Sequence, residues 1–108
     1  MKHEYKIYQL DAHDENVLKD HKMYESWEML NRTAGFNFHQ YKLVWEDDIE
    51  VYDDTASEEK ILDKLFEQFN VAHPKNYHGR SMSVSDVVVL NGTMYYCDSF
   101  GWQKIKKN

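Results

Sequence analysis

The residue types most suited to chemistry in this chain gather between His73 and Asp98. His73 and His78 stand five residues apart and Cys97 lies further along, so zinc binding is the first chemistry to consider. Zinc ligands usually come as closely spaced pairs such as Cys-x-x-Cys or His-x-x-x-His, and the sequence contains neither. We therefore predict no metal site and no cofactor, and we expect the 73–80 loop to pack on the C-terminal hairpin.

Three alternating serines suggest a second kind of chemistry. Ser81, Ser83 and Ser85 lie between His78 and Asp86, which are the residue types of a hydrolytic triad. Nothing around them resembles the strand-to-helix elbow that presents a serine nucleophile. We expect the three hydroxyls on one face of an extended segment, and Asp86 accepting backbone N–H bonds where the next strand begins. The sequence thus predicts no catalytic residue and no enzyme.

Arg80 leaves two interpretations open. It can anchor Asp86 or Asp98, or it can stay exposed as a contact residue, and the sequence favours neither. An undetected enzyme would need a polar pocket lined by Arg80, Asp86 and His78, so that a base and a cation meet at one substrate.

The acidic residues are concentrated in one stretch. Eight acids and no Lys or Arg lie between residues 46 and 59, so the total charge of −6 leaves +2 for the rest of the chain. A row of carboxylates can imitate DNA phosphates or dock on a basic groove, and it accelerates association with a basic partner. The alternative is a solvated loop whose last acids favour a helix start. The candidate partner-binding residues are Glu46, Asp47, Asp48, Glu50, Asp53 and Asp54.

The C-terminal aromatic residues are predicted to fill the core. Base-stacking surfaces carry cations between the rings, and no Lys or Arg lies between Arg80 and Lys104. Cys97 has no flanking base and is expected to be a small buried side chain. The aromatic residues concerned are Tyr95, Tyr96, Phe100 and Trp102.

These residues must be positioned by a C-terminal β-meander. Residues 86–90 form a short apolar, β-branched run that predicts a strand buried on both faces. Asn91-Gly92 follows and predicts a two-residue type I′ turn, because both positions of that turn need a positive φ. A returning strand over 94–98, a turn at Gly101 and a short strand over 102–105 complete the meander.

Two strands and two helices are predicted before the meander. Alternation indicates strands over residues 5–10 and 41–46, the latter with Tyr41, Leu43 and Trp45 on one side. Residues 11–22 are predicted to be a surface loop or a short frayed helix. Apolar residues at helical spacing predict a short helix over 23–32 that ends before Gly35.

The main helix is predicted over residues 56–69. Its apolar residues recur at helical spacing, and Thr55-Ala56-Ser57-Glu58 matches a capping box at its start. Asn70 is the expected stop. The fold class is therefore α+β, a small mixed or antiparallel sheet with this helix packed across one face.

Length and composition limit the broad class. A chain of 108 residues forms one domain, residues 1–108, around a single core. The acidic balance argues against direct binding to nucleic acids, which needs a basic face. The single cysteine, and the absence of an apolar N-terminal region or of any apolar run of about 18–20 residues, predict a cytoplasmic chain with no membrane span.

Several segments resemble the YodL-like domain. The most specific are His73-Pro74, the run Gly79-Arg80-Ser81-Met82-Ser83-Val84-Ser85-Asp86-Val87-Val88, and Tyr96-Cys97-Asp98-Ser99-Phe100-Gly101. The resemblance covers nearly the whole chain. It implies a small bacterial protein, often encoded on mobile elements of Gram-positive bacteria, with no catalytic residue or cofactor to carry over. The acidic stretch 46–59 is longer and more charged than the usual connector of that family.

Together these features predict a non-enzymatic protein-interaction module from a mobile genetic element. Its most concrete form is an acidic inhibitor of a host nucleic-acid-targeting defence system, of the anti-CRISPR or antirestriction type, bound to a basic groove of its partner. The second candidate is a regulatory binding protein for a cytoskeletal or cell-envelope target, which the resemblance implies because the namesake of the family is connected with cell shape.

Overall fold

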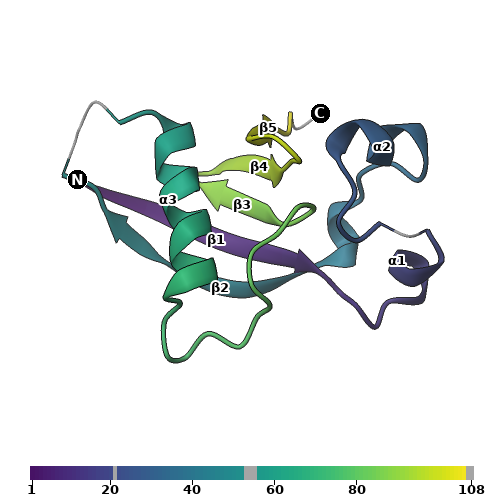
Figure 1. The fold of residues 1–108 in the computed structure, drawn as a ribbon, viewed down its shortest axis with the longest axis horizontal. Helices are drawn as coiled ribbons and strands as arrows, with labels where there is room; N and C mark the ends of the chain where they lie inside the picture. Colours follow the sequence, from purple (N-terminus) through teal and green to yellow (C-terminus); the bar gives the residue numbers. More distant parts are fainter. Residues whose placement is uncertain (21, 53–55, 107–108) are drawn as a thin grey trace.

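In the part of the chain that the structure describes, five strands form one antiparallel sheet in the order β2-β1-β3-β4-β5. The computed structural model describes residues 1–20, 22–52 and 56–106 (Figure 1). Its strands are β1 (Lys2–Leu10), β2 (Tyr41–Glu50), β3 (Val87–Leu90), β4 (Thr93–Cys97) and β5 (Trp102–Lys104). Its helices are α1 (Glu15–Lys19), α2 (Trp27–Arg32) and α3 (Glu58–Val71), with a 3-10 turn η1 over Phe38–Gln40. The predicted α+β class and C-terminal meander are confirmed.

The central strand β3 is buried on both faces, as the sequence predicts. Val87 and Val88 point to opposite faces of the sheet and both are fully buried. The turn that follows has φ values of 48° at Asn91 and 83° at Gly92, as a type I′ turn requires. This turn sets the register in which β3 pairs with β4.

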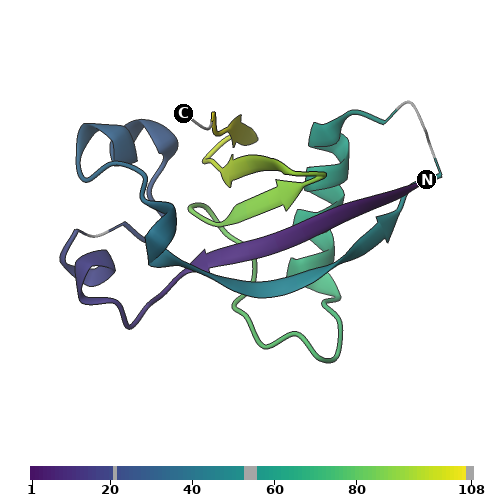
Figure 2. The same ribbon diagram turned by 180° about the vertical axis from the view of Figure 1, so that it is seen from behind.

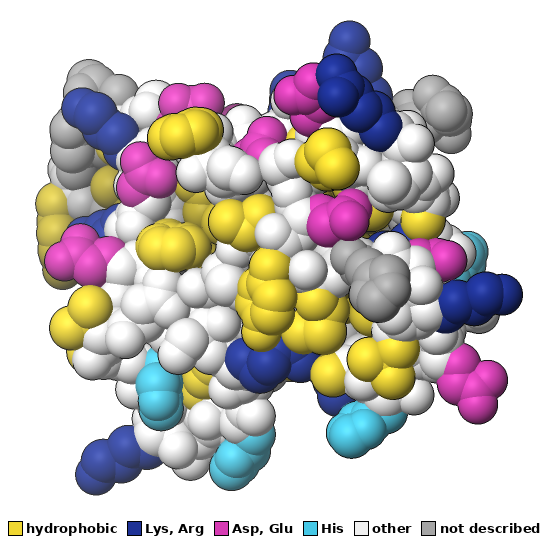
Figure 3. All heavy atoms as spheres, turned by 45° about the vertical axis from the view of Figure 1, so that its right-hand side comes forward, with side chains coloured by type: hydrophobic (Ala, Val, Ile, Leu, Met, Phe, Trp, Pro, Cys, Tyr) yellow, Lys and Arg dark blue, Asp and Glu magenta, His cyan; other side chains and the backbone are white. Residues whose placement is uncertain are grey.

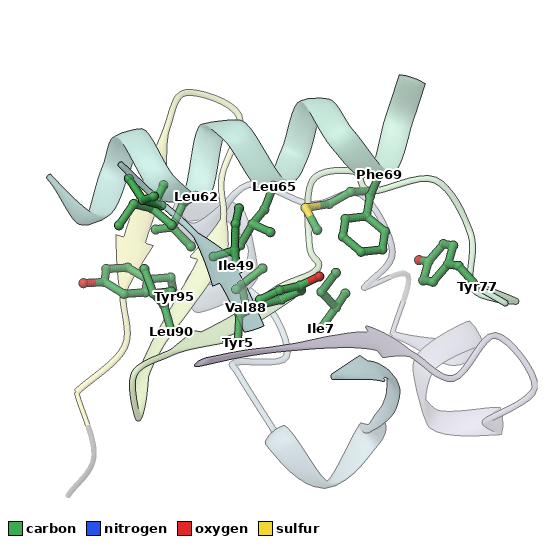
Figure 4. Packing of buried hydrophobic residues seen from close by; sticks show 13 residues of the cluster. Tyr5, Ile7, Ile49, Leu62, Leu65, Phe69, Tyr77, Val88, Leu90 and Tyr95 are labelled. Carbon is green, nitrogen blue, oxygen red and sulfur yellow. The ribbon is translucent and has the colours of Figure 1, made fainter. Parts of the chain in front are cut away.

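Helix α3 covers one face of the sheet. Its apolar stripe consists of Ile61, Leu62, Leu65 and Phe69, which pack on side chains of β1, β2, β3 and β4 (Figure 4). The helix begins and ends two residues later than predicted. Ser57 is its N-cap, with Oγ accepting a hydrogen bond from the Lys60 amide, so the predicted capping box is wrong. Thr55 lies outside the described residues.

A second, mostly aromatic core lies on the opposite face at one end of the sheet. Leu30 of α2 is buried there against strand residues and a cluster of rings. The predicted 23–32 helix starts only at Trp27, because Tyr24 has a φ of 68° and Ser26 provides the N-cap. Gly35 ends the turn after the helix with a φ of 79°, as predicted. The rings belong to Trp27, Phe36, Phe38, Tyr41 and Tyr96.

No helix of the described residues crosses the rest of that second face. In Figure 2 the sheet lies in front of α3, while α1 and α2 stand beside its end. We call the part of this face beyond α2 the open face. On the side that carries α1 and α2, hydrophobic side chains also reach the surface (Figure 3), and they include Leu18, Tyr24 and Met29.

A β-bulge divides β2 into two halves. Ile7 pairs with Trp45 but Tyr8 pairs with Leu43, so Val44 has no partner on β1. Trp45 therefore packs in the core under α3, whereas Tyr41 packs in the aromatic core on the other face. The prediction that Tyr41, Leu43 and Trp45 share one side is wrong, because the extra residue reverses the alternation.

The bulge can be tested by comparing two truncations on β2. Trp45 packs against Phe69 and Tyr77, with ring centroids 6.3 and 6.1 Å apart, whereas Leu43 is about half exposed. We expect Trp45→Ala to lower the free energy of unfolding by about 2–3 kcal/mol and Leu43→Ala by less than about 1 kcal/mol. Urea denaturation measures both. Equal losses would contradict the assignment of the two side chains to opposite faces.

Candidate functional site

The acidic stretch begins on the edge strand of the sheet rather than in a loop. Among the described strands β2 pairs only with β1, and its C-terminal half contains Glu46, Asp47 and Asp48, all exposed. Its register sets Glu46 opposite Lys6 and Asp48 opposite Glu4. The backbone of β2 therefore holds these carboxylates in a fixed row.

The acids of β2 are distributed over both faces. Tyr5 and Ile7 face α3, so their neighbours Glu4 and Lys6 point to the open face, and cross-strand partners share a face. Glu46 and Asp48 consequently lie on the open face, whereas Asp47, opposite Tyr5, lies on the α3 side. A hollow of about 450 Å³ lies beside these acids of β2 and the facing residues of β1, and we call it the acidic hollow. It is lined by Glu4, Tyr5, Lys6, Glu46, Asp47, Asp48, Val89 and Gly92.

Glu50 is already engaged within the chain. Its Oε1 accepts a hydrogen bond of 2.8 Å from the Met1 ammonium group, and this bond lowers the pKa of the Glu50 carboxyl. Ile49 and Val51 on either side are buried in the core. Of the six candidate residues, Asp53 and Asp54 lie outside the described residues. The exposed acids that the structure places together are therefore Glu46, Asp47 and Asp48.

A buried polar cluster joins the C-terminal end of β1 to the segment before β3. Gln9 is 1% exposed, and its amide bonds both backbone groups of Arg80: Nε2 donates to the carbonyl and Oε1 accepts from the N–H, each at 3.0 Å. Nε2 also donates to Oδ2 of Asp86 at 3.1 Å, and this oxygen accepts the Ser83 amide at 3.0 Å. The Gln9 side chain thus links β1 to the 72–86 segment. Sequence reasoning did not single out Gln9, because a lone glutamine in a strand has no distinctive pattern.

Asp86 accepts backbone N–H bonds at the strand entry, as predicted. It is 2% exposed, and this burial raises the pKa of its carboxyl to about 6, although bonds from Ser83 and Gln9 and the Arg80 charge act in the opposite direction. Its bonds hold the turn before β3. They do not leave a carboxylate facing solvent for acid–base chemistry.

The three serines do not share a face. Residues 83–86 form a turn in which the Asp86 amide donates to the Ser83 carbonyl, and Ser85 has a φ of 87°. Ser81 is exposed, whereas Ser85 is buried with its Oγ accepting the Tyr24 amide. The predicted strand alternation is wrong here because a turn replaces it.

The 73–80 loop packs beneath α3 and not on the C-terminal hairpin as predicted. Tyr77 is buried against Phe69, with ring centroids 4.9 Å apart, and its hydroxyl donates to the Arg80 carbonyl. A Cβ on Gly79 would collide with the Tyr77 ring, so a larger residue at that position would displace this side chain. The Arg80 guanidinium donates to the Leu10 carbonyl at 2.9 Å, and neither Asp86 nor Asp98 forms an ion pair with it among the described residues.

A second hollow of about 340 Å³ lies between this loop and β2. We call it the basic hollow, because its charged lining residues are cationic. The lining residues are Gln9, Lys42, Leu43, Val44, His78, Gly79 and Arg80. Asp86 is not among them, so the polar pocket of His78, Asp86 and Arg80 that an enzyme would need is only partly present.

The aromatic and cysteine predictions are mostly confirmed. Tyr95, Tyr96 and Cys97 are buried, and burial raises the pKa of the Cys97 thiol to about 12. Trp102 packs edge-on against Phe66. Phe100 was expected in the core but is 96% exposed at the tip of the β4–β5 turn. Within the described ranges no group of three or more His, Cys, Asp or Glu side chains could hold a metal ion.

Comparison with known families decides the relationship of the chain. The family model of the YodL-like domain matches residues 4–107, which is nearly the whole length. The chain belongs to the YodL-like domain family. The match spans both the acidic edge strand and the C-terminal meander of this YodL-like domain. No curated protein and no solved structure matches the chain.

None of the helices in the described residues is both long and apolar enough to cross a membrane.

Removing the hydrogen bonds that the Gln9 side chain makes to Arg80 and Asp86 should destabilise the fold strongly. Gln9→Leu would remove the hydrogen-bond partner of the partly buried Arg80 backbone and one of the two donors to the buried Asp86 carboxylate, so we expect the free energy of unfolding to fall by about 3 kcal/mol or more. The matched control is Gln103→Leu at an exposed position of β5. This substitution should change the free energy of unfolding by less than about 0.5 kcal/mol. Similar losses in the two variants, measured by urea denaturation, would refute the bridging role.

Asp86 predicts a specific pH dependence of stability. Its pKa is about 6 in the folded chain against an ordinary value of 3.8, so the folded state binds the proton more tightly. Its contribution to stability should therefore be greatest below pH 3.8, fall as the pH rises to about 6, and stay constant above that. The free energy of unfolding of the wild type minus that of Asp86→Asn should drop by roughly 2–3 kcal/mol between pH 3.8 and about 6. A flat difference in thermal or urea unfolding between pH 3.5 and 7 would contradict it.

Proposed function

We propose that this YodL-like domain is a non-enzymatic, cytoplasmic protein-interaction module of a mobile genetic element, and that it inhibits a nucleic-acid-targeting defence protein of the host. The observation that carries the proposal is the row of exposed carboxylates on an edge strand. Glu46, Asp47 and Asp48 occupy successive positions of β2, where no other described strand or helix covers them. A partner can therefore reach them from the edge and from both faces of the sheet.

The backbone of β2 makes this row a preorganised ligand. Same-face side chains of a strand repeat about every 6.8 Å, so Glu46 and Asp48 present negative charge at a regular spacing. Their backbone pairs with β1, and no ordering of a loop is needed before binding. A rigid row of carboxylates suits a groove that normally holds the phosphates of a nucleic acid.

Like charges that face each other across β1 and β2 also support a basic partner. Glu4 stands directly opposite Asp48 and both side chains are exposed, a like-charge pair that weakens the sheet by itself. A basic groove laid over the acidic hollow would relieve that repulsion. Charges of this kind also steer encounter, so the association rate should fall as ionic strength rises.

The edge position explains why a basic partner is favoured over a second copy. An exposed strand edge can pair with another chain, and charged side chains are a common device against it. Two copies of β2 would bring their acids together at a cost in free energy. The same charges attract a surface rich in Lys and Arg.

The proposal is tested by neutralising the acids. A variant with Asp47→Asn, Asp48→Asn, Asp53→Asn and Asp54→Asn should keep its thermal unfolding temperature within a few degrees. We expect its affinity for the captured partner to fall by at least about tenfold, because each desolvated charge contact is lost. Affinity capture from a Gram-positive host, followed by binding assays with the purified partner, gives the measurement.

The matched control removes the same charge elsewhere. Glu15→Gln, Glu58→Gln, Glu59→Gln and Glu67→Gln change four exposed helix acids and should leave affinity unchanged. DNA should compete with the domain for its partner. Unchanged affinity of the acidic-strand variant would refute the proposal, and a captured cytoskeletal or envelope protein that DNA does not displace would favour the second candidate function.

A further inference from the structure

The basic hollow sits in a chain dominated by acids, yet its ionisable lining residues are Lys42, His78 and Arg80. None of the three lies within 4.0 Å of a carboxylate in the described residues, where the ion pairs are Met1–Glu50 and Arg32–Glu28. The chain has 19 acids to 13 Lys and Arg residues, so basic side chains that share a hollow without an ion-paired carboxylate need an explanation. We propose that the basic hollow binds the phosphoryl group of a small molecule.

The β-bulge at Val44 creates the arrangement. Without the bulge, the alternation set by Trp45 would turn Lys42 away from the α3 side of the sheet. With it, Lys42 stands opposite Gln9 on that side, where the 77–80 segment passes. Bulges often re-aim a side chain beside a functional site.

Hydrogen bonds hold the Arg80 side of the hollow rigidly. Gln9 fixes the backbone N–H and carbonyl of Arg80, and one guanidinium nitrogen donates to the Leu10 carbonyl at 2.9 Å. A guanidinium has five N–H donors, so this contact leaves the remainder for a ligand. The side chain is therefore oriented before any ligand arrives, which reduces the entropy lost on binding.

The nearby carboxylate of Asp86 does not occupy the site. It lies behind the Gln9 amide, where Oδ2 accepts from Gln9 and Ser83, and it does not line the hollow. Gln9 therefore separates the Asp86 carboxylate from a ligand in the hollow. The close fit of Gly79 against Tyr77 keeps the loop backbone near the same space.

A phosphoryl group matches these donors better than a carboxylate does. The hollow offers a planar fork from Arg80, a point charge from Lys42 and an imidazole from His78, which approach from the loop and from β2. A tetrahedral phosphoryl group has three terminal oxygens that can accept from three directions, and arginine and lysine are its common partners. The site is separate from the acidic half of β2 and does not depend on the proposed function.

Nuclear magnetic resonance titration of the full chain tests the inference. Inorganic phosphate, phenyl phosphate and acetate are added separately at constant ionic strength. We expect saturable shifts at the Gly79 and Arg80 amides and at Arg80 Nε with a phosphate probe, and weaker, non-saturating shifts with acetate. Saturation by phenyl phosphate indicates a phosphomonoester as the natural source, and saturation by inorganic phosphate alone indicates the free ion.

Variants with a matched control complete the test. Lys42→Gln/His78→Gln should weaken phosphate binding by about tenfold or more, because two charge-assisted contacts are lost. Lys75→Gln/His73→Gln changes the same residue types at exposed positions of the same loop outside the hollow, and it should bind as wild type does. Equal weakening of the two variants, equal binding of acetate, or no saturation by either phosphate probe would overturn the inference.

Discussion

The structure depends on one buried amide. Gln9 replaces backbone pairing at the end of β1, because its side chain bonds the N–H and carbonyl of Arg80 as a neighbouring strand would. The same amide supports Asp86, whose carboxylate holds the turn that leads into β3. Two segments far apart in the chain are thereby joined by side-chain hydrogen bonds. A buried polar group is tolerated here because both Nε2 hydrogens and the Oε1 oxygen of Gln9 are hydrogen-bonded.

The bulge in β2 gives one strand two chemical characters. Beyond Val44 the strand carries exposed acids on both of its faces, and before it Lys42 joins Arg80 and His78 beside the loop. Opposite charges are thus separated along the edge of the sheet instead of neutralising each other. A single extra residue sets this division, since it reverses which face every preceding side chain occupies.

Local signals in the sequence predicted much of the fold. The β-branched run of β3, the Asn91-Gly92 turn and the apolar spacing of α3 each depend on residues close together in the chain, and all three are confirmed. The bulge and the Gln9 bridge depend on partners many residues away, so no window of sequence contains their signal. The acidic stretch was visible as composition, but the strand conformation of residues 46–50 required knowledge of β1 as the partner strand.

The position of β1 between β2 and β3 determines when the domain can form. Tyr5, near the start of the chain, pairs with both Asp47 and Leu90. During synthesis the first strand can pair with β2 early. Its other edge, and the part of the α3 core that Val88, Leu90 and Tyr95 supply, stay open until β3 and β4 leave the ribosome. Such non-local pairing has a high loop-closure entropy and slows folding. The sheet of this domain is therefore completed only after β3 has emerged and paired with the second edge of β1.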